Sequence, residues 1–166
     1  MRLRVSVIAA TVATAAFAAS ATAGPPGAGT LVLGTSLGGV RLGMTLDQLE
    51  QTWGLAYGRC RGCARPTLYF NLFAFRPEGA GVELARDRVS AVFTLWAPGA
   101  WRTAEGVEIG ENVAGVTATY GPLRRTQCRG YYALTLPSRR AVNAIYVVGD
   151  EVWGFGLLAR DAPVCR

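Results

Sequence analysis

The four cysteines are the residues of this chain that could most directly carry chemistry. Cys60 and Cys63 form a C-x-x-C, the spacing of thiol oxidoreductases, in which a helix N-terminus gives the reactive cysteine its thiolate character. Here the motif follows the expected end of a helix, although Arg59, Arg61 and Arg65 would still favour a thiolate. Thiol-redox activity of Cys60 and Cys63 is therefore one hypothesis for the function.

An even number of cysteines in an exported protein favours disulfides, and several pairings are open to four cysteines. Cys60 and Cys128 lie at similar distances beyond a motif that occurs twice in the chain, which suggests one bridge in each half. We therefore expect the pairs Cys60–Cys63 and Cys128–Cys165. A four-cysteine zinc site usually shows two close pairs, and Cys128 lies far from Cys165, so no metal site is expected.

Most nucleophilic chemistry is excluded by composition. The chain has no histidine, and all 17 of its basic residues are arginine. Ser-His and Cys-His pairs, histidine metal ligands and lysine Schiff bases are therefore impossible. The carboxylates Asp47 and Glu50, like the adjacent Asp150 and Glu151, have no neighbour that would separate their pKa values, as an acid–base pair requires. We expect no enzyme and no cofactor.

Two clusters of arginine could instead contact a partner, and both are expected in loops between a helix and a strand. They comprise Arg59, Arg61 and Arg65, and Arg124, Arg125 and Arg129. The net charge of +6 falls to +4 without Arg2 and Arg4. A net charge of this size permits an acidic protein or an anionic envelope polymer as partner. Binding to nucleic acid is not expected of an exported and modestly charged chain.

Aromatic side chains are the other candidates for a binding surface, because exposed rings act as anchors at interfaces. Trp153 and Phe155 occupy alternate positions of the last expected strand, so they should share one bulky face. The same rings could also fill the core beneath the helices. The candidate binding aromatics are Tyr69, Phe73, Trp96, Trp101, Trp153 and Phe155.

The elements that must position these residues follow from an internal repeat. The segment 39–54 matches the segment 106–121 at a constant offset of 67 positions. Identical residues recur at Gly39, Val40, Gly43, Thr52 and Gly54, matched by Gly106, Val107, Gly110, Thr119 and Gly121. The chain is therefore expected to contain two copies of one unit.

Each copy predicts a short helix. Thr45 and Asn112 are good N-cap residues, and Gln48 would complete a capping box in the first copy. Apolar residues recur with helical spacing after each cap. Gly54 and Gly121 stand where a helix end favours a left-handed residue.

The remaining apolar stretches predict three antiparallel strands for each unit, with hairpin turns near Arg86-Asp87 and Gly149-Asp150. The expected fold class is α+β: two tandem units, each a helix plus three antiparallel strands, with the helices packed on one face of the sheet. We assign residues 38–103 to the first repeat and 104–166 to the second. The strands are expected at 67–75, 81–85, 87–96, 131–136, 144–148 and 150–158.

A G-V-x-[LI]-G start, a capped helix ending in an aromatic residue and glycine, a cysteine soon afterwards and then three strands, all in two copies, resemble the β-lactamase inhibitor protein family. The pattern is also similar to the small lipoproteins of the outer-membrane barrel-assembly machinery, which carry one such unit. The resemblance covers roughly residues 38–160. It implies a secreted tandem repeat whose concave, often aromatic-rich sheet face docks a partner protein, without cofactor or catalysis.

The first residues predict export. Arg2 and Arg4 precede an uncharged run of about 15 residues, and Ala21-Thr22-Ala23 has the small residues of a cleavage site. That run is too short to span a bilayer. We expect a signal peptide over 1–23, a flexible Gly/Pro-rich lead over 24–37, and a secreted or extracytoplasmic protein, with cell-envelope association possible, that does not span the membrane after cleavage.

These expectations combine into one functional hypothesis with two alternatives. The leading hypothesis is a secreted, non-enzymatic binding module that recognises a protein or an anionic envelope polymer through an aromatic sheet face and arginine-rich loops. One alternative is a structural protein of the cell envelope. The other is a thiol-redox protein acting through Cys60 and Cys63.

Overall fold

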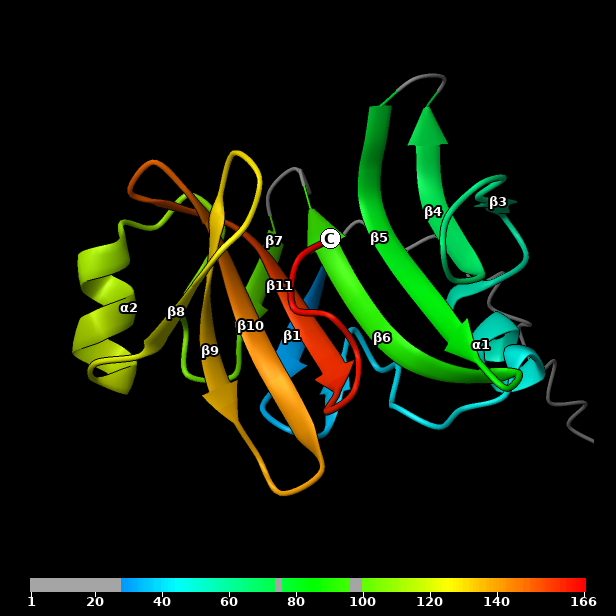
Figure 1. Cartoon of the computed structure of the whole chain (residues 1–166), viewed down its shortest axis with the longest axis horizontal. Coiled ribbons are helices and arrows are strands. Elements are labelled where there is room, and N and C mark those ends of the chain that lie inside the picture. Colours follow the sequence, from blue (N-terminus) through cyan, green and yellow to red (C-terminus); the bar gives the residue numbers. More distant parts are fainter. Residues whose placement is uncertain (1–27, 74–75, 96–99) are drawn as a thin grey trace, which may run out of the picture.

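The structure is a computed structural model that describes residues 28–73, 76–95 and 100–166 (Figure 1). The described residues form an α+β protein with two short helices, a main sheet of eight strands and a small sheet of three. The expected signal peptide and Trp96 lie outside the described residues. Phe73 ends a strand, but its side chain is likewise outside the description.

The main sheet is antiparallel and has the order β3-β4-β5-β6-β11-β10-β9-β8. Strands from the first half of the chain occupy one side and strands from the second half the other, and the halves meet where β6 pairs with β11 (Figure 1). The bounds are β3 (Tyr57–Arg59), β4 (Thr67–Phe73), β5 (Arg76–Ala85), β6 (Arg88–Leu95), β8 (Arg124–Gln127), β9 (Tyr132–Pro137), β10 (Ala141–Val148) and β11 (Glu151–Ala159).

The small sheet corrects one prediction. It comprises β1 (Ala28–Val32), β2 (Ser36–Leu37) and β7 (Ala100–Thr103), with β1 antiparallel to β2 and parallel to β7. Residues 28–32 and 36–37, expected in a flexible lead, are therefore paired strands joined by a turn. Leu31 and Leu37 are fully buried, and this burial is what holds a Gly-rich stretch in place.

The helices are those that the repeated motif predicted. α1 spans Leu46–Trp53 and α2 spans Val113–Tyr120. The Thr45 side chain accepts a hydrogen bond from the Gln48 backbone, and the Gln48 side chain accepts one from the Thr45 backbone, which confirms the capping box. Asn112 caps α2 through the Ala114 N–H at 2.9 Å.

Both helix starts are attached to the sheet in the same way. The Gly43 N–H donates to the Val89 carbonyl at 2.8 Å, and the Gly110 N–H donates to the Val152 carbonyl at 2.8 Å. Nevertheless, two separate tandem units are not seen, because backbone pairing joins both halves into one continuous sheet. In the main sheet, the expected three strands per half are also corrected to four, because the short edge strands β3 and β8 lack a clear apolar pattern.

The main sheet has two dissimilar faces. The helix face is covered by α1, α2 and the small sheet and holds the larger core, around residues such as Trp53, Phe70, Val116, Ile145 and Phe155. The opposite face, here called the tail face, is crossed by residues 160–166, the tail (Figure 1). A smaller apolar cluster lies there, around Ala91, Phe93, Tyr131, Tyr146 and Leu158, and the tail residue Ala162 belongs to it.

Candidate binding site

A hollow of ≈ 730 Å³ lies on the tail face, between the strands of the first half and the tail. Its walls include the rings of Tyr69, Phe93 and Trp153, and its rim includes Arg65 and Arg129. The hollow therefore brings together aromatic and arginine candidates that lie as much as 88 positions apart in the sequence, from Arg65 to Trp153.

Glycine makes room for the rings. Gly81 of β5 pairs with Tyr69 of β4 on one side and with Phe93 of β6 on the other. A Cβ atom at Gly81 would lie 2.4 Å from Phe93 Cζ, so the ring can lie over this position only because the side chain is absent. Tyr69 and Phe93 make an edge contact, with centroids 6.4 Å apart. Together they form one wall of the hollow.

Trp153 reaches the hollow through an irregularity in β11. The pairing of β10 with β11 shifts between Tyr146, opposite Gly154, and Val147, opposite Val152, which leaves Trp153 as an extra residue. Such a bulge reverses the alternation of side chains beyond it. Trp153 is therefore half-buried on the tail face, 5.4 Å from the Tyr131 ring.

The same bulge corrects the prediction for Phe155. Strict alternation placed Phe155 beside Trp153, but its side chain lies on the helix face with 0% exposure. Trp101 is also corrected, because it is only 1% exposed and contacts Trp53 in the main core, with ring centroids 6.3 Å apart. Neither ring can reach a partner without unfolding the core.

The arginine clusters are divided between the two faces. Arg65 and Arg129 line the hollow, and Arg61 is exposed in the Cys60–Cys63 loop. Arg59 lies in β3, with its guanidinium 5.5 Å from the Tyr57 ring, and Arg125 lies in β8, 3.7 Å from the Tyr132 ring.

Tyr57 and Tyr132 both contact the core of the helix face, which places Arg59 and Arg125 away from the hollow. Arg124 lines a second hollow of ≈ 490 Å³ on the tail face. The prediction that both clusters are loops is thus wrong for Arg59, Arg124 and Arg125, which are strand residues.

All four cysteines form disulfides, in the two expected pairs Cys60–Cys63 and Cys128–Cys165. Cysteines bonded in this way have no thiolate to offer a zinc ion. Within the described residues, no group of three or more carboxylates or cysteines could hold a metal ion. Cys63 and Cys165 both line the hollow, so each disulfide anchors a segment of its wall.

The charged groups at the floor of the hollow are paired. Arg166 Nη1 lies 2.6 Å from Glu83 Oε1, and the guanidinium stands 5.3 Å from the Phe93 ring. Burial, and secondarily the Glu83 charge, raises the pKa of Tyr69 above its ordinary value. The Tyr69 phenol is therefore neutral at physiological pH, where it can donate a hydrogen bond to a ligand.

Sequence reasoning missed four residues of this site: Phe93, Tyr131, Glu83 and Arg166. Phe93 stands opposite two glycines, Gly81 and Gly156, and an aromatic residue paired with glycine across a sheet was a usable signal. Glu83 and Arg166 are 83 positions apart, so only the folded chain relates them.

Comparisons with known proteins establish no family. No family model matches the chain, and no curated protein matches it. A solved structure that is similar is the 1.5 Å crystal structure of an extracellular protein containing a SCP domain from Bacillus anthracis str. Ames. The TM-score is 0.49 at 12% sequence identity, over 72% of this chain and 44% of that one. This chain thus spans less than half of that protein.

The resemblance to the β-lactamase inhibitor protein family is corrected by these findings. Its motifs consist of glycines, caps and short apolar stripes, which many unrelated folds use for the same local reasons. No family model and no curated protein supports the assignment. In the described part of the chain, no helix is long and apolar enough to cross a membrane.

Proposed function

We propose that this protein is an extracytoplasmic, non-enzymatic binding module that holds a segment of a partner protein in the hollow of the tail face. The observation that carries the proposal is that one hollow brings together aromatic rings and two rim arginines: Tyr69, Phe93, Tyr131 and Trp153, with Arg65 and Arg129. The few residues that carry most of the binding energy at protein interfaces are enriched in Trp, Tyr and Arg.

The charges indicate the chemistry of the partner. Glu83, the carboxylate that lines the hollow, is already paired with Arg166. Among the described residues, the Arg65 side chain donates to the Asp161 carbonyl alone, at 3.4 Å, and neither Arg65 nor Arg129 makes an ion pair. A segment with a carboxylate beside an apolar side chain would therefore complement both the rim and the rings.

An extracytoplasmic location is supported by the cysteines and by the first residues of the chain. Disulfides persist in oxidising compartments, and here both pairs are formed. The expected signal peptide over 1–23 leads to the same location.

We also propose that the two halves of the chain are copies of one unit that have merged into a single sheet. The matched attachments of Gly43 to Val89 and of Gly110 to Val152 support this relation. Such an origin would explain why a disulfide-bearing segment of each half contributes an arginine, Arg65 or Arg129, to the same hollow.

The proposal can be tested by selecting random dodecapeptides, displayed on phage, against the oxidised, exported protein. We expect enrichment of peptides that combine Asp or Glu with an aromatic or aliphatic residue. Trp153→Ala should weaken a selected peptide about ten-fold or more, as expected of an interface anchor. The double variant Arg65→Gln, Arg129→Gln should weaken it and reduce its salt dependence.

The matched control is the double variant Arg59→Gln, Arg125→Gln, which removes the same charge from the helix face. Equal affinity of a selected peptide for both double variants would refute the proposal. Binding of poly-L-glutamate that Trp153→Ala leaves unchanged would instead identify a general anion-binding surface, as an envelope polymer requires.

A further inference from the structure

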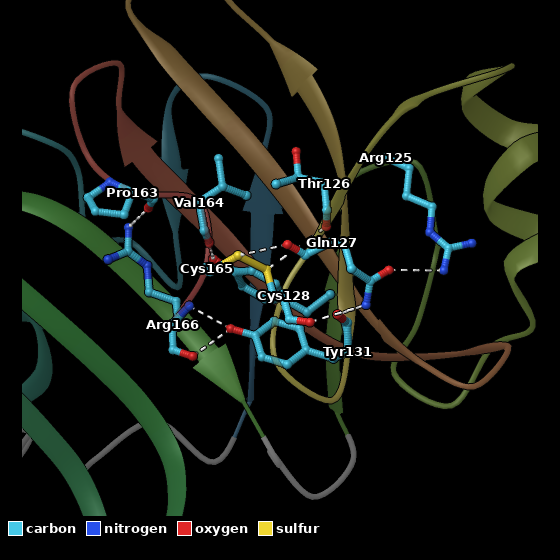
Figure 2. The surroundings of a disulfide bond; sticks show 10 residues. Arg125, Thr126, Gln127, Cys128, Tyr131, Pro163, Val164, Cys165 and Arg166 are labelled. Atoms are coloured by element: carbon cyan, nitrogen blue, oxygen red, sulfur yellow. Dashed lines mark hydrogen bonds between the residues drawn. A yellow bond between two sulfur atoms is a disulfide. The ribbon is translucent and has the colours of Figure 1, made fainter.

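The tail is attached to the sheet by polar contacts as well as by a disulfide (Figure 2). Cys165 is bonded to Cys128, and the Tyr146 hydroxyl donates to the Val164 carbonyl at 3.0 Å. The Tyr131 hydroxyl accepts from the Arg166 N–H and donates to the Arg166 carbonyl, each at 2.5 Å. Phenol groups of the tail face thus bind the tail backbone in the way that they would bind a separate peptide.

The Arg166 side chain occupies a site of matched chemistry and is only 2% exposed. Glu83 supplies a carboxylate at 2.6 Å, Phe93 an aromatic face at 5.3 Å, and the Pro163 carbonyl an acceptor at 2.5 Å. A buried guanidinium is costly unless charge and hydrogen bonds compensate it. The carboxylate and the ring supply part of that compensation, through an ion pair and a cation–π contact.

The compensation is incomplete, which distinguishes this pair from an optimised core contact. Arg166 Nε and Glu83 Oε2 are both buried and lack a hydrogen-bond partner among the described residues. A buried polar atom without a partner costs free energy relative to water. The tail is therefore attached less favourably than its buried area alone would imply.

The tail also divides what would otherwise be one groove. The hollow of ≈ 730 Å³ and the hollow of ≈ 490 Å³ lie on the same face, and Pro163 and Cys165 line both. Beneath the tail the sheet presents small residues, Ala133 and Ala144, beside Tyr146. Without the tail, a surface made for an extended chain would continue from Tyr69 to Arg124.

We propose that residues 162–166 are a tethered occupant of a peptide-binding groove on the tail face, and that Glu83 and Phe93 form a subsite for an arginine side chain whose backbone Tyr131 binds. An extended segment that carries arginine takes the place of the tail when the tail is not held by Cys128–Cys165. The disulfide gives the tail a high effective concentration, so a free peptide does not compete with it in the oxidised protein. This inference concerns the chain's own segment and does not rest on the proposed acidic partner.

The first test uses the full chain with Cys128→Ser, Cys165→Ser and Arg166→Ala, which frees the tail and empties the subsite. The probe is a fluorescent peptide with the sequence of residues 162–166 and serine in place of cysteine. Its binding is measured as the increase in fluorescence anisotropy. We expect it to bind this variant at least about ten-fold more tightly than it binds the oxidised wild type. Replacing its arginine by citrulline, which removes the charge at constant shape, should weaken binding about ten-fold or more.

The matched control is Cys60→Ser, Cys63→Ser, which removes the other disulfide and leaves the tail in place, so it should bind no more peptide than the wild type. The inference is overturned if the control and the tail-free variant bind equally, or if the citrulline peptide binds as tightly as the arginine peptide.

A second measurement decides the matter if the tail-free variant does not fold. Arg166→Ala alone keeps the disulfide, and millimolar methylguanidinium should raise its melting temperature more than methylammonium does. The wild type, whose subsite is full, and the double variant Arg166→Ala, Glu83→Gln should show no such difference. Equal shifts in all three proteins would overturn the arginine subsite.

Discussion

Removal of the Cys128–Cys165 disulfide is expected to destabilise this protein about twice as much as removal of Cys60–Cys63. The two pairs are 37 and 3 residues apart in the sequence. A disulfide that closes a longer loop withdraws more conformational entropy from the unfolded chain, which corresponds to about 4 kcal/mol for the long loop and about 2 kcal/mol for the short one. Substituting serine for both cysteines of each pair should reproduce that order.

The two substitutions are well matched, because each pair has one half-buried and one exposed cysteine. Urea unfolding at neutral pH, followed by circular dichroism, gives the free energies by linear extrapolation. With a slope of about 2 kcal/mol per molar urea, the midpoints of the two variants should differ by about 1 M. Equal midpoints, or a larger loss without Cys60–Cys63, would refute this assignment of stability to loop length.

Two further outcomes test the bulge in β11 and the buried phenols. Phe155→Ala should cost about 3–5 kcal/mol in urea unfolding and Trp153→Ala clearly less, because only Phe155 is fully buried; equal costs would contradict the bulge. Burial raises the pKa of Tyr146 above its ordinary value of about 10, so the stability that this neutral phenol contributes is complete below pH 10 and is lost as the pH rises towards its folded-state pKa. Urea midpoints from pH 8 to 11 should therefore fall above pH 10, with a smaller fall in Tyr146→Phe than in the wild type; an identical fall would contradict the assignment.

The elements that depend on neighbouring residues were predictable. Thr45, Asn112, Gln48, Gly54 and Gly121 act on backbone groups within one helical turn, so their types alone locate both helices. The turn at Arg86-Asp87 was predicted in the same way, and both residues have positive φ. The α+β class followed from these elements, whereas the merging of both halves into one sheet did not.

The candidate site was predictable only in part. Tyr69, Trp153, Arg65 and Arg129 were chosen for their residue types, and the structure places them around one hollow. Phe155 was assigned to the wrong face because a single extra residue in a strand reverses every side chain beyond it. A bulge depends on pairing with β10, and pairing between strands is not visible in either strand alone.

The sequence by itself therefore determined the local features of this protein: capped helices, hairpin turns, an exclusively arginine basic set, and cysteines suited to two disulfides. Only the tertiary structure decided which rings are buried, which arginines share a face, and that the tail covers the aromatic sheet with Arg166 against Glu83. The physical reason is the separation along the sequence of the groups that interact. Caps and turns satisfy hydrogen bonds within a few residues, whereas the hollow depends on contacts between segments tens of residues apart, whose free energy exists only once the whole sheet has formed.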